Sequence, residues 1–275
     1  MPSRPPVPAT VFILSVSSDI GTQLALDYLR RGATVCGTYR SGLPAALAGQ
    51  ERFHAVRCDV STPACAKTIA GLFRRTGLQW DVFISCVGQL SPIGLFFDSA
   101  FEAWAQSVQT NSVAQLRALH AAYPFRHAGQ LCHVVLFAGG GTNNPFRAYS
   151  AYCLGKIALI KMCELLDDEN PDLNPFIVGT GWVQTKIHRQ TLAAGTKAGA
   201  NFATTQKFIA EGKSGTAFQD ISALIDWGIA HGKRVSGGRN FSLVHDAWRQ
   251  GGGRPLAAAL RADPAKFKLR RQGNS

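Results

Sequence analysis

The amino-acid sequence predicts an α/β fold in which about seven parallel strands form one doubly wound sheet flanked by helices. Two observations lead to this prediction. Short runs of β-branched and apolar residues alternate with longer amphipathic stretches, and each chemically distinctive segment follows the end of such a run. Because alternating strands and helices form right-handed crossovers, the sheet is expected to be parallel, with its ligand crevice beyond the carboxyl ends of the strands.

Seven segments carry the strand pattern, and they lie at residues 11–15, 33–38, 53–57, 81–86, 131–137, 174–179 and 240–244. The amphipathic stretches between them predict helices, including one over residues 22–31 and one over residues 148–168.

The 275 residues are enough to bury one large core, so we expect a single domain. We place this domain at residues 11–250, between an N-terminal tail of residues 1–10 and a basic tail of residues 251–275, whose residues 266–271 are expected to form a frayed end. Residues 186–215 interrupt the alternation of strands and helices. They are expected to form either a mobile lid over a substrate pocket or a pair of surface helices.

The formal charge of +12 at pH 7 admits two interpretations, an anionic cofactor or substrate, or general solubility. Nucleic-acid binding is not expected, because no aromatic residues are interleaved with the basic ones. The seven cysteines include no Cys-x-x-Cys pair, so neither a disulfide framework nor a metal site is predicted. No apolar run reaches the roughly 20 residues of a membrane span, and we expect a cytoplasmic protein with no membrane partner.

A turn of small residues follows the first predicted strand and reads Ser-Val-Ser-Ser-Asp-Ile-Gly over residues 15–21. Such a turn aims free backbone N–H groups and the positive end of the next helix at a phosphate. Asp19 is expected to cap that helix, and the Cβ of Ser15 is expected to restrict the approach of a pyrophosphate. The predicted contacts are therefore Ser15, Ser17, Ser18, Asp19, Ile20 and Gly21.

Arg40 follows the second predicted strand, where a dinucleotide fold places the residue that binds the adenosine ribose. An acidic residue there would bind the ribose hydroxyls of NAD, whereas a guanidinium suits a 2′-phosphate. Arg40 therefore favours NADP(H) as the cofactor. The alternative is a solvated surface arginine.

Tyr152 and Lys156 are four residues apart in the helix predicted over residues 148–168, so their side chains share one face. A phenol is a weak acid at neutral pH, but a neighbouring ammonium stabilises the phenolate and lowers the pKa of the phenol. This pair is therefore predicted to transfer a proton.

In order and spacing, these motifs resemble the short-chain dehydrogenase/reductase family over nearly the whole chain. The turn at residues 15–21 is similar to the family's Thr-Gly-x-x-x-Gly-x-Gly, with Ser15 and Asp19 in place of its first two glycines. Tyr152 and Lys156 match its Tyr-x-x-x-Lys. The resemblance implies a Rossmann-type fold and gives Lys156 the further role of holding the nicotinamide ribose. Asn111 matches the family asparagine that helps to hold a water beside this lysine.

The resemblance implies further cofactor contacts, each soon after a predicted strand. Asp59 and Val60 match an Asp-Val pair that touches the adenine, and Gly88 ends a segment in the place of Asn-Asn-Ala-Gly. Residues 179–185 are similar to Pro-Gly-x-Val-x-Thr, which adds Val183 and places Thr185 at the nicotinamide carboxamide.

The catalytic serine of the family is missing. Its expected position, about thirteen residues before Tyr152, holds Gly139 in a triglycine run. Loss of such a hydrogen-bond donor typically costs a few kcal/mol of transition-state stabilisation. Thr142, Asn143, Asn144 or a hydroxyl of the substrate is expected to replace it. Otherwise the site is slow or inactive, and Gly139→Ser is then expected to raise activity.

These motifs predict an NADP(H)-dependent oxidoreductase that acts on a small-molecule carbonyl or secondary alcohol. Residues 138–144 and 238–242 resemble reductases of bacterial surface-polysaccharide or sugar pathways, which favours a phosphorylated or nucleotide-linked sugar as the anionic substrate. One alternative is a weakly active or non-catalytic dinucleotide-binding, redox-sensing protein. Another is a nucleotide-sugar epimerase or dehydratase, which is less expected because only about 30 residues follow the last predicted strand. In relatives the helix at 148–168 builds a dimer interface, so a homodimer or homotetramer is expected, although core burial also explains its apolar residues.

Overall fold

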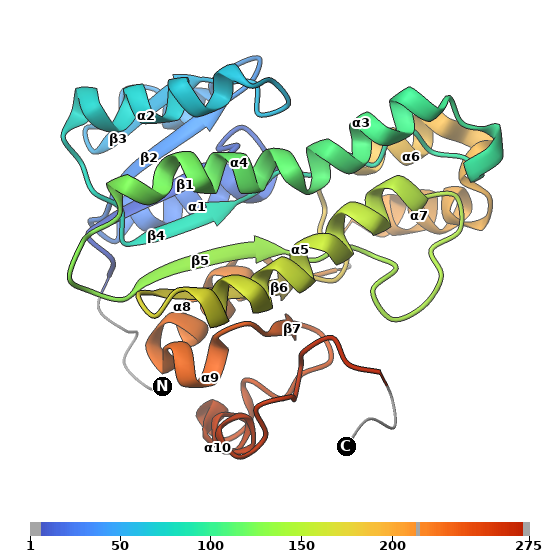
Figure 1. Ribbon diagram of the computed structural model, residues 1–275. Helices are drawn as coiled ribbons and strands as arrows, with labels where there is room; N and C mark the ends of the chain where they lie inside the picture. The colour runs from blue at the N-terminus through green and yellow to red at the C-terminus, as the bar shows by residue number, and fades with distance from the viewer. Residues whose placement is uncertain (1–6, 213–214, 272–275) are drawn as a thin grey trace.

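A computed structural model of the chain describes residues 7–212 and 215–271. Residues 1–6 of the predicted N-terminal tail, 213–214 of the predicted lid and 272–275 of the predicted basic tail lie outside the described residues. The described residues form one parallel sheet of seven strands in the order β3-β2-β1-β4-β5-β6-β7 (Figure 1). The predicted fold class is therefore confirmed. The strands, each within two residues of its predicted bounds, are β1 (Thr10–Leu14), β2 (Thr34–Tyr39), β3 (Phe53–Arg57), β4 (Val82–Ser85), β5 (Cys132–Phe137), β6 (Leu173–Gly179) and β7 (Asn240–Ser242).

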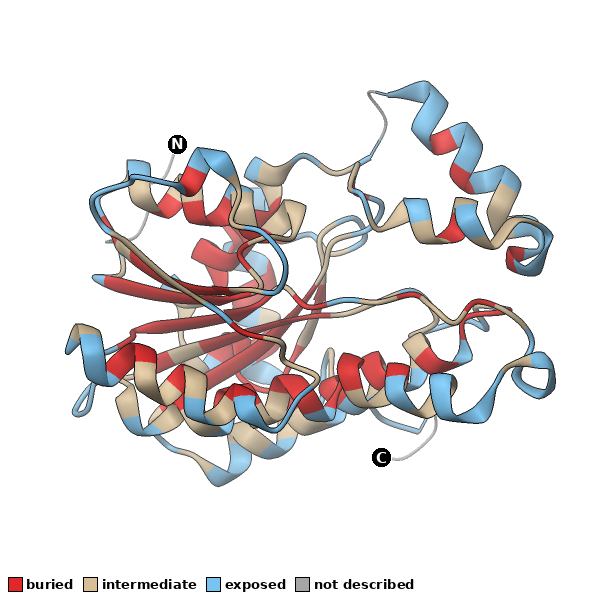
Figure 2. Cartoon of the chain, turned by 90° about the horizontal axis from the view of Figure 1, so that it is seen from above, coloured by how far each residue is buried: buried red, intermediate tan, exposed pale blue. Residues whose placement is uncertain are grey.

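Helices cover both faces of the sheet, because successive side chains of a strand point to opposite faces. On β1, Val11 and Ile13 join one apolar cluster, whereas Phe12 and Leu14 join the other. Figure 2 shows the buried residues concentrated along the strands, between the helical layers.

None of the described helices is long and apolar enough to cross a membrane. One layer contains α1 (Asp19–Arg30), α8 (Phe218–His231), α9 (Lys233–Ser236) and α10 (Arg254–Ala262), and the other contains α2 (Ala64–Thr76), α4 (Val113–Ala122) and α5 (Ser150–Glu169).

A glycine brings α3 (Phe101–Asn111) close to α5. A Cβ on Gly155 would lie 2.6 Å from the Cβ of Asn111 and 3.3 Å from the carbonyl oxygen of Val108. Only glycine permits so close an approach of two helices. The contact places the end of α3 beside the turn of α5 that carries Lys156.

Residues 186–215 contain two helices, α6 (His188–Ala194) and α7 (Ala200–Glu211), joined by a short 3₁₀ turn. They lie beyond the carboxyl end of the sheet, near the outer ends of α3 and α5 (Figure 1). This segment therefore has the helical structure of the second sequence interpretation, at a place where it can also cover the crevice.

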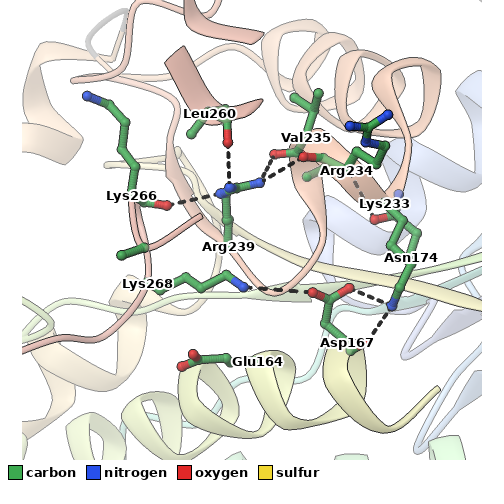
Figure 3. Close-up of polar contacts among 12 residues, drawn as sticks. Glu164, Asp167, Asn174, Lys233, Arg234, Val235, Arg239, Leu260, Lys266 and Lys268 are labelled. Carbon is green, nitrogen blue, oxygen red and sulfur yellow. Dashed lines mark hydrogen bonds and ion pairs between the residues drawn. The ribbon is translucent and has the colours of Figure 1, made fainter. Parts of the chain in front are cut away.

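The segment after β7 packs against the sheet. Leu256 and Leu260 of α10 are buried in the same apolar cluster as α1 and α8. Arg239, only 4% exposed, lies beneath this segment, as Figure 3 shows. The tail of residues 251–271 therefore packs on the domain. The prediction of a frayed end at residues 266–271 is wrong, because Arg270 pairs with Glu164 and the buried guanidinium of Arg239 is satisfied by backbone oxygens. These are the carbonyl oxygens of Arg234, Val235, Leu260, Asp263 and Lys266.

The strand order reverses between β1 and β4, which in an open α/β sheet is the point where a ligand crevice forms. The turns and loops that follow β1, β2, β4, β5 and β6 meet at this edge and build the site.

Candidate active site

The turn between β1 and α1 is closed by its serines and a glycine. Ser15 has a φ of 70°, in the left-handed region, and its carbonyl oxygen accepts hydrogen bonds from the N–H (3.1 Å) and the hydroxyl (2.9 Å) of Ser18. A Cβ on Gly21 would lie 2.3 Å from the Ser15 carbonyl oxygen, so this position requires glycine. Within the described residues, the N–H groups of Asp19 and Ile20 have no carbonyl acceptor. The positive end of α1 is therefore open to a phosphate.

Asp19 does not cap α1, contrary to the expectation from the sequence. Ser18 is the cap, because its hydroxyl oxygen accepts the N–H of Gly21 at 3.0 Å. Asp19 is the first helical residue, and its carboxylate accepts the backbone N–H of Lys186, in the loop after β6, at 2.5 Å. The Lys186 ammonium donates to the carbonyl oxygen of Ser17 at 2.5 Å and lies 3.7 Å from the Asp19 carboxylate. Asp19 thus connects the two sides of the crevice.

Arg40 and Asp59 lie at the other end of the crevice, after β2 and β3. The Ser61 hydroxyl donates to Asp59 at 2.7 Å, and this hydrogen bond, assisted by the charge of Arg40, holds the pKa of Asp59 below its usual range. Arg57 donates to the carbonyl oxygen of Arg40 at 3.1 Å and so orders its backbone. This end of the crevice therefore offers an exposed guanidinium next to a charged carboxylate.

Tyr152 and Lys156 lie one turn apart on α5. Lys156 is 2% exposed, donates to the carbonyl oxygen of Val87 at 3.0 Å, and holds its Nζ 5.9 Å from the centre of the Tyr152 ring. Burial lowers the pKa of Lys156 to about 8. Burial also raises the pKa of Tyr152 above its usual range, and the predicted lowering by the Lys156 ammonium is not found. Tyr152 is therefore a protonated phenol, and hence a proton donor, at neutral pH.

Asn111 fastens the loop that follows β4. Its Nδ2 donates to the carbonyl oxygen of Gln89 at 2.8 Å, and its Oδ1 accepts the N–H of Gln89 at 3.0 Å. Val87, whose carbonyl oxygen accepts from Lys156, belongs to the same loop. Asn111 thus positions Lys156 through this loop, and its predicted contact with a water stays a prediction.

The segment after β5 has no serine, and the ring of Tyr152 lies against it. A Cβ on Gly139 would lie 2.5 Å from Cε1 and 2.6 Å from the hydroxyl oxygen of Tyr152. The Thr142 hydroxyl donates to the carbonyl oxygen of Gly139 at 3.0 Å and so closes the glycine turn. The geometry opposes the expectation that Gly139→Ser raises activity, because a side chain at this position would displace the phenol.

These segments line one cavity of about 1980 Å³ at the carboxyl ends of the strands. Two predicted site residues, Gly21 and Asn111, do not line it and support its wall from behind. The others line it: Ser15, Ser17, Ser18, Asp19, Ile20, Arg40, Asp59, Val60, Gly88, Thr142, Tyr152, Lys156, Val183 and Thr185.

The family model described as short chain dehydrogenase matches residues 9–195, which is more than half of the chain. The chain belongs to the short-chain dehydrogenase family. Members of this family are oxidoreductases that bind a nicotinamide cofactor. The family resemblance predicted from the motifs is thereby confirmed. No curated protein matches the sequence significantly.

Solved structures of two short-chain dehydrogenases and of an aldohexose dehydrogenase share the fold. One from Saccharomyces cerevisiae is 19% identical, with a TM-score of 0.75 over 87% of this chain and 98% of that chain. One from Shigella flexneri, complexed with NADP, is 19% identical, with a TM-score of 0.72 over 88% and 99% of the two chains. The aldohexose dehydrogenase of Thermoplasma acidophilum is also 19% identical, with a TM-score of 0.65 over 79% and 85%.

The crevice of this short-chain dehydrogenase fits a dinucleotide. The turn that Gly21 makes possible presents the free N–H groups of Asp19 and Ile20, which suit a pyrophosphate. The cavity also contains Arg40, after β2 on one side of β1, and Lys156, which contacts the loop after β4 on the other side of β1. The residues present can therefore hold both halves of the cofactor.

At one edge of the short-chain dehydrogenase crevice, two neighbouring residues of α6 hold this helix in place. Gln190 accepts the backbone N–H groups of Leu90 and Ser91 at 2.9 and 3.0 Å. Thr191 shares a buried hydrogen bond of 2.9 Å with the hydroxyl of Tyr149, just before α5. α6 is thus fastened both to the loop after β4 and to the residue that precedes α5, the helix that carries Tyr152.

The sequence interpretation missed several residues of this short-chain dehydrogenase site. Thr38 accepts the N–H of Ser15 at 3.0 Å, and Lys186 binds the phosphate turn. A weak signal existed for Lys186, because it directly follows Thr185 in a segment already assigned to the cofactor. The hydroxyls of Tyr149 and Thr191 gave no such signal, since their contact joins residues 42 positions apart.

Proposed function

We propose that this short-chain dehydrogenase is an NADP(H)-dependent oxidoreductase that interconverts a carbonyl and a secondary alcohol. The observation that carries the proposal is the single cavity that has Arg40 at one end and the Tyr152–Lys156 pair at the other. The NADP complex of the Shigella flexneri relative, and a second one from Burkholderia cenocepacia, support the choice of cofactor.

When bound, the nicotinamide supplies or accepts the hydride. Tyr152, kept protonated by burial, donates its proton to the carbonyl oxygen during reduction. Lys156 holds the nicotinamide ribose, and Asn111 positions Lys156 by fastening the loop at Val87 to Gln89. Thr142, which lines the cavity beside Gly139, is the proposed donor that replaces the missing serine, by turning its hydroxyl from the carbonyl oxygen of Gly139 to the substrate oxygen.

The proposed substrate is a sugar, phosphorylated or nucleotide-linked. The net charge of +12 and the fold shared with an aldohexose dehydrogenase support this choice. Residues 186–215 are proposed to cover this substrate, with α6 as the fixed edge, because Gln190 and Thr191 already fasten it. Association of the chain is proposed to use α5, where Leu154 and Leu165 are exposed.

The proposal is tested first by cofactor binding. We expect NADPH to bind more tightly than NADH, and Arg40→Asp to reduce or reverse that preference by at least about tenfold in the ratio of the two dissociation constants. Arg74→Asp, an equal charge change on the exposed end of α2, is the control and should leave the ratio unchanged. Calorimetric titration of both cofactors decides the matter. An unchanged ratio in Arg40→Asp would show that Arg40 does not bind the 2′-phosphate.

Gly139 favours one second candidate, a dinucleotide-binding sensor without turnover, because the family's serine hydroxyl is absent there. Incubation with NADPH and a panel of ketones and ketosugars separates the two functions. Tight NADPH binding with no oxidation across the panel would support the sensor.

A further inference from the structure

A charged bridge crosses the crevice between the phosphate turn and the loop after β6. It joins Asp19 and Ser17 on one side to Lys186 on the other through two hydrogen bonds of 2.5 Å and an ion pair of 3.7 Å. All three residues line the cavity. The bridge is absent from the family pattern, which has glycine at the position of Asp19.

The carboxylate of Asp19 creates an electrostatic conflict with the proposed cofactor. Asp19 and Ile20 supply the open N–H groups that suit a pyrophosphate, so the carboxylate lies beside the place where two phosphate charges would bind. Like charges at such separations oppose binding, and partial burial strengthens the effect because the screening by water is weaker. A cation at the same place would offset it.

Lys186 can supply that cation. Its ammonium has three N–H donors, and its long side chain is half exposed, with 53% of the side-chain surface accessible. The backbone N–H of Lys186, not its ammonium, makes the 2.5 Å hydrogen bond to the carboxylate. The ammonium can therefore leave Ser17 and Asp19 by side-chain rotation alone, while the loop stays attached to the turn.

We propose that Lys186 is a pyrophosphate ligand that Asp19 holds in place until the cofactor binds. On binding, the ammonium exchanges the Ser17 carbonyl and the Asp19 carboxylate for the pyrophosphate oxygens. The Asp19 carboxylate keeps the Lys186 backbone N–H and limits the affinity for the cofactor. This inference rests on the proposed binding of NADP(H).

The test uses dissociation constants measured by calorimetry on the intact protein. Lys186→Gln should weaken NADPH binding about tenfold and reduce its dependence on salt concentration, because one phosphate contact is lost. Asp19→Asn keeps an oxygen acceptor for the Lys186 N–H but removes the charge, so it should tighten NADPH binding about three- to tenfold. Lys207→Gln, an equal charge change on exposed α7, is the control and should have no effect.

A second ligand separates this inference from the proposed function. Adenosine 2′-monophosphate carries the 2′-phosphate but no pyrophosphate, so Arg40→Asp should weaken its binding whereas Lys186→Gln should not. Unchanged NADPH affinity in Lys186→Gln, in a protein that binds NADPH, would overturn the role of Lys186 alone. Weaker binding in Asp19→Asn would overturn the opposing role of Asp19. Failure of the parent protein to bind NADPH would overturn the proposed function and this inference together.

Discussion

The turn after β1 and the segment after β5 carry opposite exchanges relative to the family pattern. The first has Ser15 where the family has glycine, and the second has Gly139 where the family has serine. Ser15 adopts a φ of 70°, which costs a side-chain-bearing residue about 1–2 kcal/mol but leaves the turn closed by Ser18. Gly139 has no backbone conflict; instead the phenol of Tyr152 occupies the space of the absent side chain.

The two exchanges therefore differ in how easily they can be reversed. Returning glycine to position 15 removes atoms and relieves strain. Returning serine to position 139 adds atoms where the ring of Tyr152 already lies. Exchanging a residue in a turn affects only the backbone of that turn. Exchanging a residue in a packed site also changes the positions of the neighbouring side chains. Four measurements test this difference.

The largest effect is expected for Tyr152→Phe, which keeps the ring against Gly139 and removes only the hydroxyl. Turnover of the best carbonyl substrate should fall roughly 10²- to 10⁴-fold, the range for loss of a general acid, with NADPH affinity nearly unchanged. Tyr149→Phe is the matched control, because it breaks the buried hydrogen bond to Thr191 but leaves the proton donor in place. Comparable turnover in Tyr152→Phe and the parent protein would remove Tyr152 from the mechanism.

For Gly139→Ser we expect a loss of turnover of about 10- to 100-fold, because the new Cβ would push the phenol out of position. Gly139→Ala should lose a similar factor, since the clash comes from the Cβ and not from the hydroxyl. NADPH affinity should stay within about twofold of the parent in both variants, because Gly139 follows β5 and is not part of the phosphate turn after β1. A Gly139→Ser variant faster than the parent would show that the Tyr152 ring moves aside at little cost in free energy. The exchange at residue 139 would then be as reversible as that at residue 15.

The buried Lys156 makes the catalytic side sensitive to pH. Because burial lowers its pKa to about 8, the cationic form is present below that pH and is lost above it. The value of kcat/KM for NADPH, which reports the free protein, should be constant below pH 8 and then fall about tenfold per pH unit. Tyr152 remains protonated over this range, because burial raises its pKa. The downturn should disappear in Lys156→Arg, whose side chain stays charged; a downturn that persists there belongs to another group.

The smallest effect is expected for Ser15→Gly. Relief of the left-handed strain, less the added entropy of the unfolded chain, should raise the free energy of unfolding by about 1 kcal/mol or less. NADPH binding should tighten by no more than about threefold as the Cβ is removed from the phosphate turn. Thermal unfolding and calorimetric titration measure the two changes. Destabilisation by Ser15→Gly would mean that the Ser15 side chain makes a contact that outweighs the strain.

The strands and most of the cavity lining could be predicted from the sequence because each depends on local order. Short apolar runs mark the strands, and the parallel topology then brings the residues after each strand to one edge. Arg40, Asp59 and Tyr152 line a common cavity for this reason, although more than 90 residues separate Asp59 from Tyr152.

Contacts set by packing could not be predicted in this way. The bridge from Asp19 to Lys186 joins residues 167 positions apart, and its existence depends on the path of the loop after β6. The capping role of Ser18 depends on the backbone geometry of one turn, so the prediction of Asp19 as the cap was wrong. The position of the Tyr152 ring against Gly139 depends on the volume left by a missing side chain, which no spacing rule describes.

Because Arg239 anchors the C-terminal segment, this segment covers part of the sheet edge at β7. The N–H of Asn240 on β7 donates to the carbonyl oxygen of Phe267 at 2.9 Å, so part of that edge is already hydrogen-bonded within the chain. Within residues 7–212 and 215–271, no strand pairs with the outer side of β3, but Arg52 and Arg57 place positive charge at its two ends. An edge that is covered and an edge that is charged both resist the strand-to-strand growth that leads to aggregation. Growth of the sheet from one copy of the chain to the next is thus disfavoured at both edges.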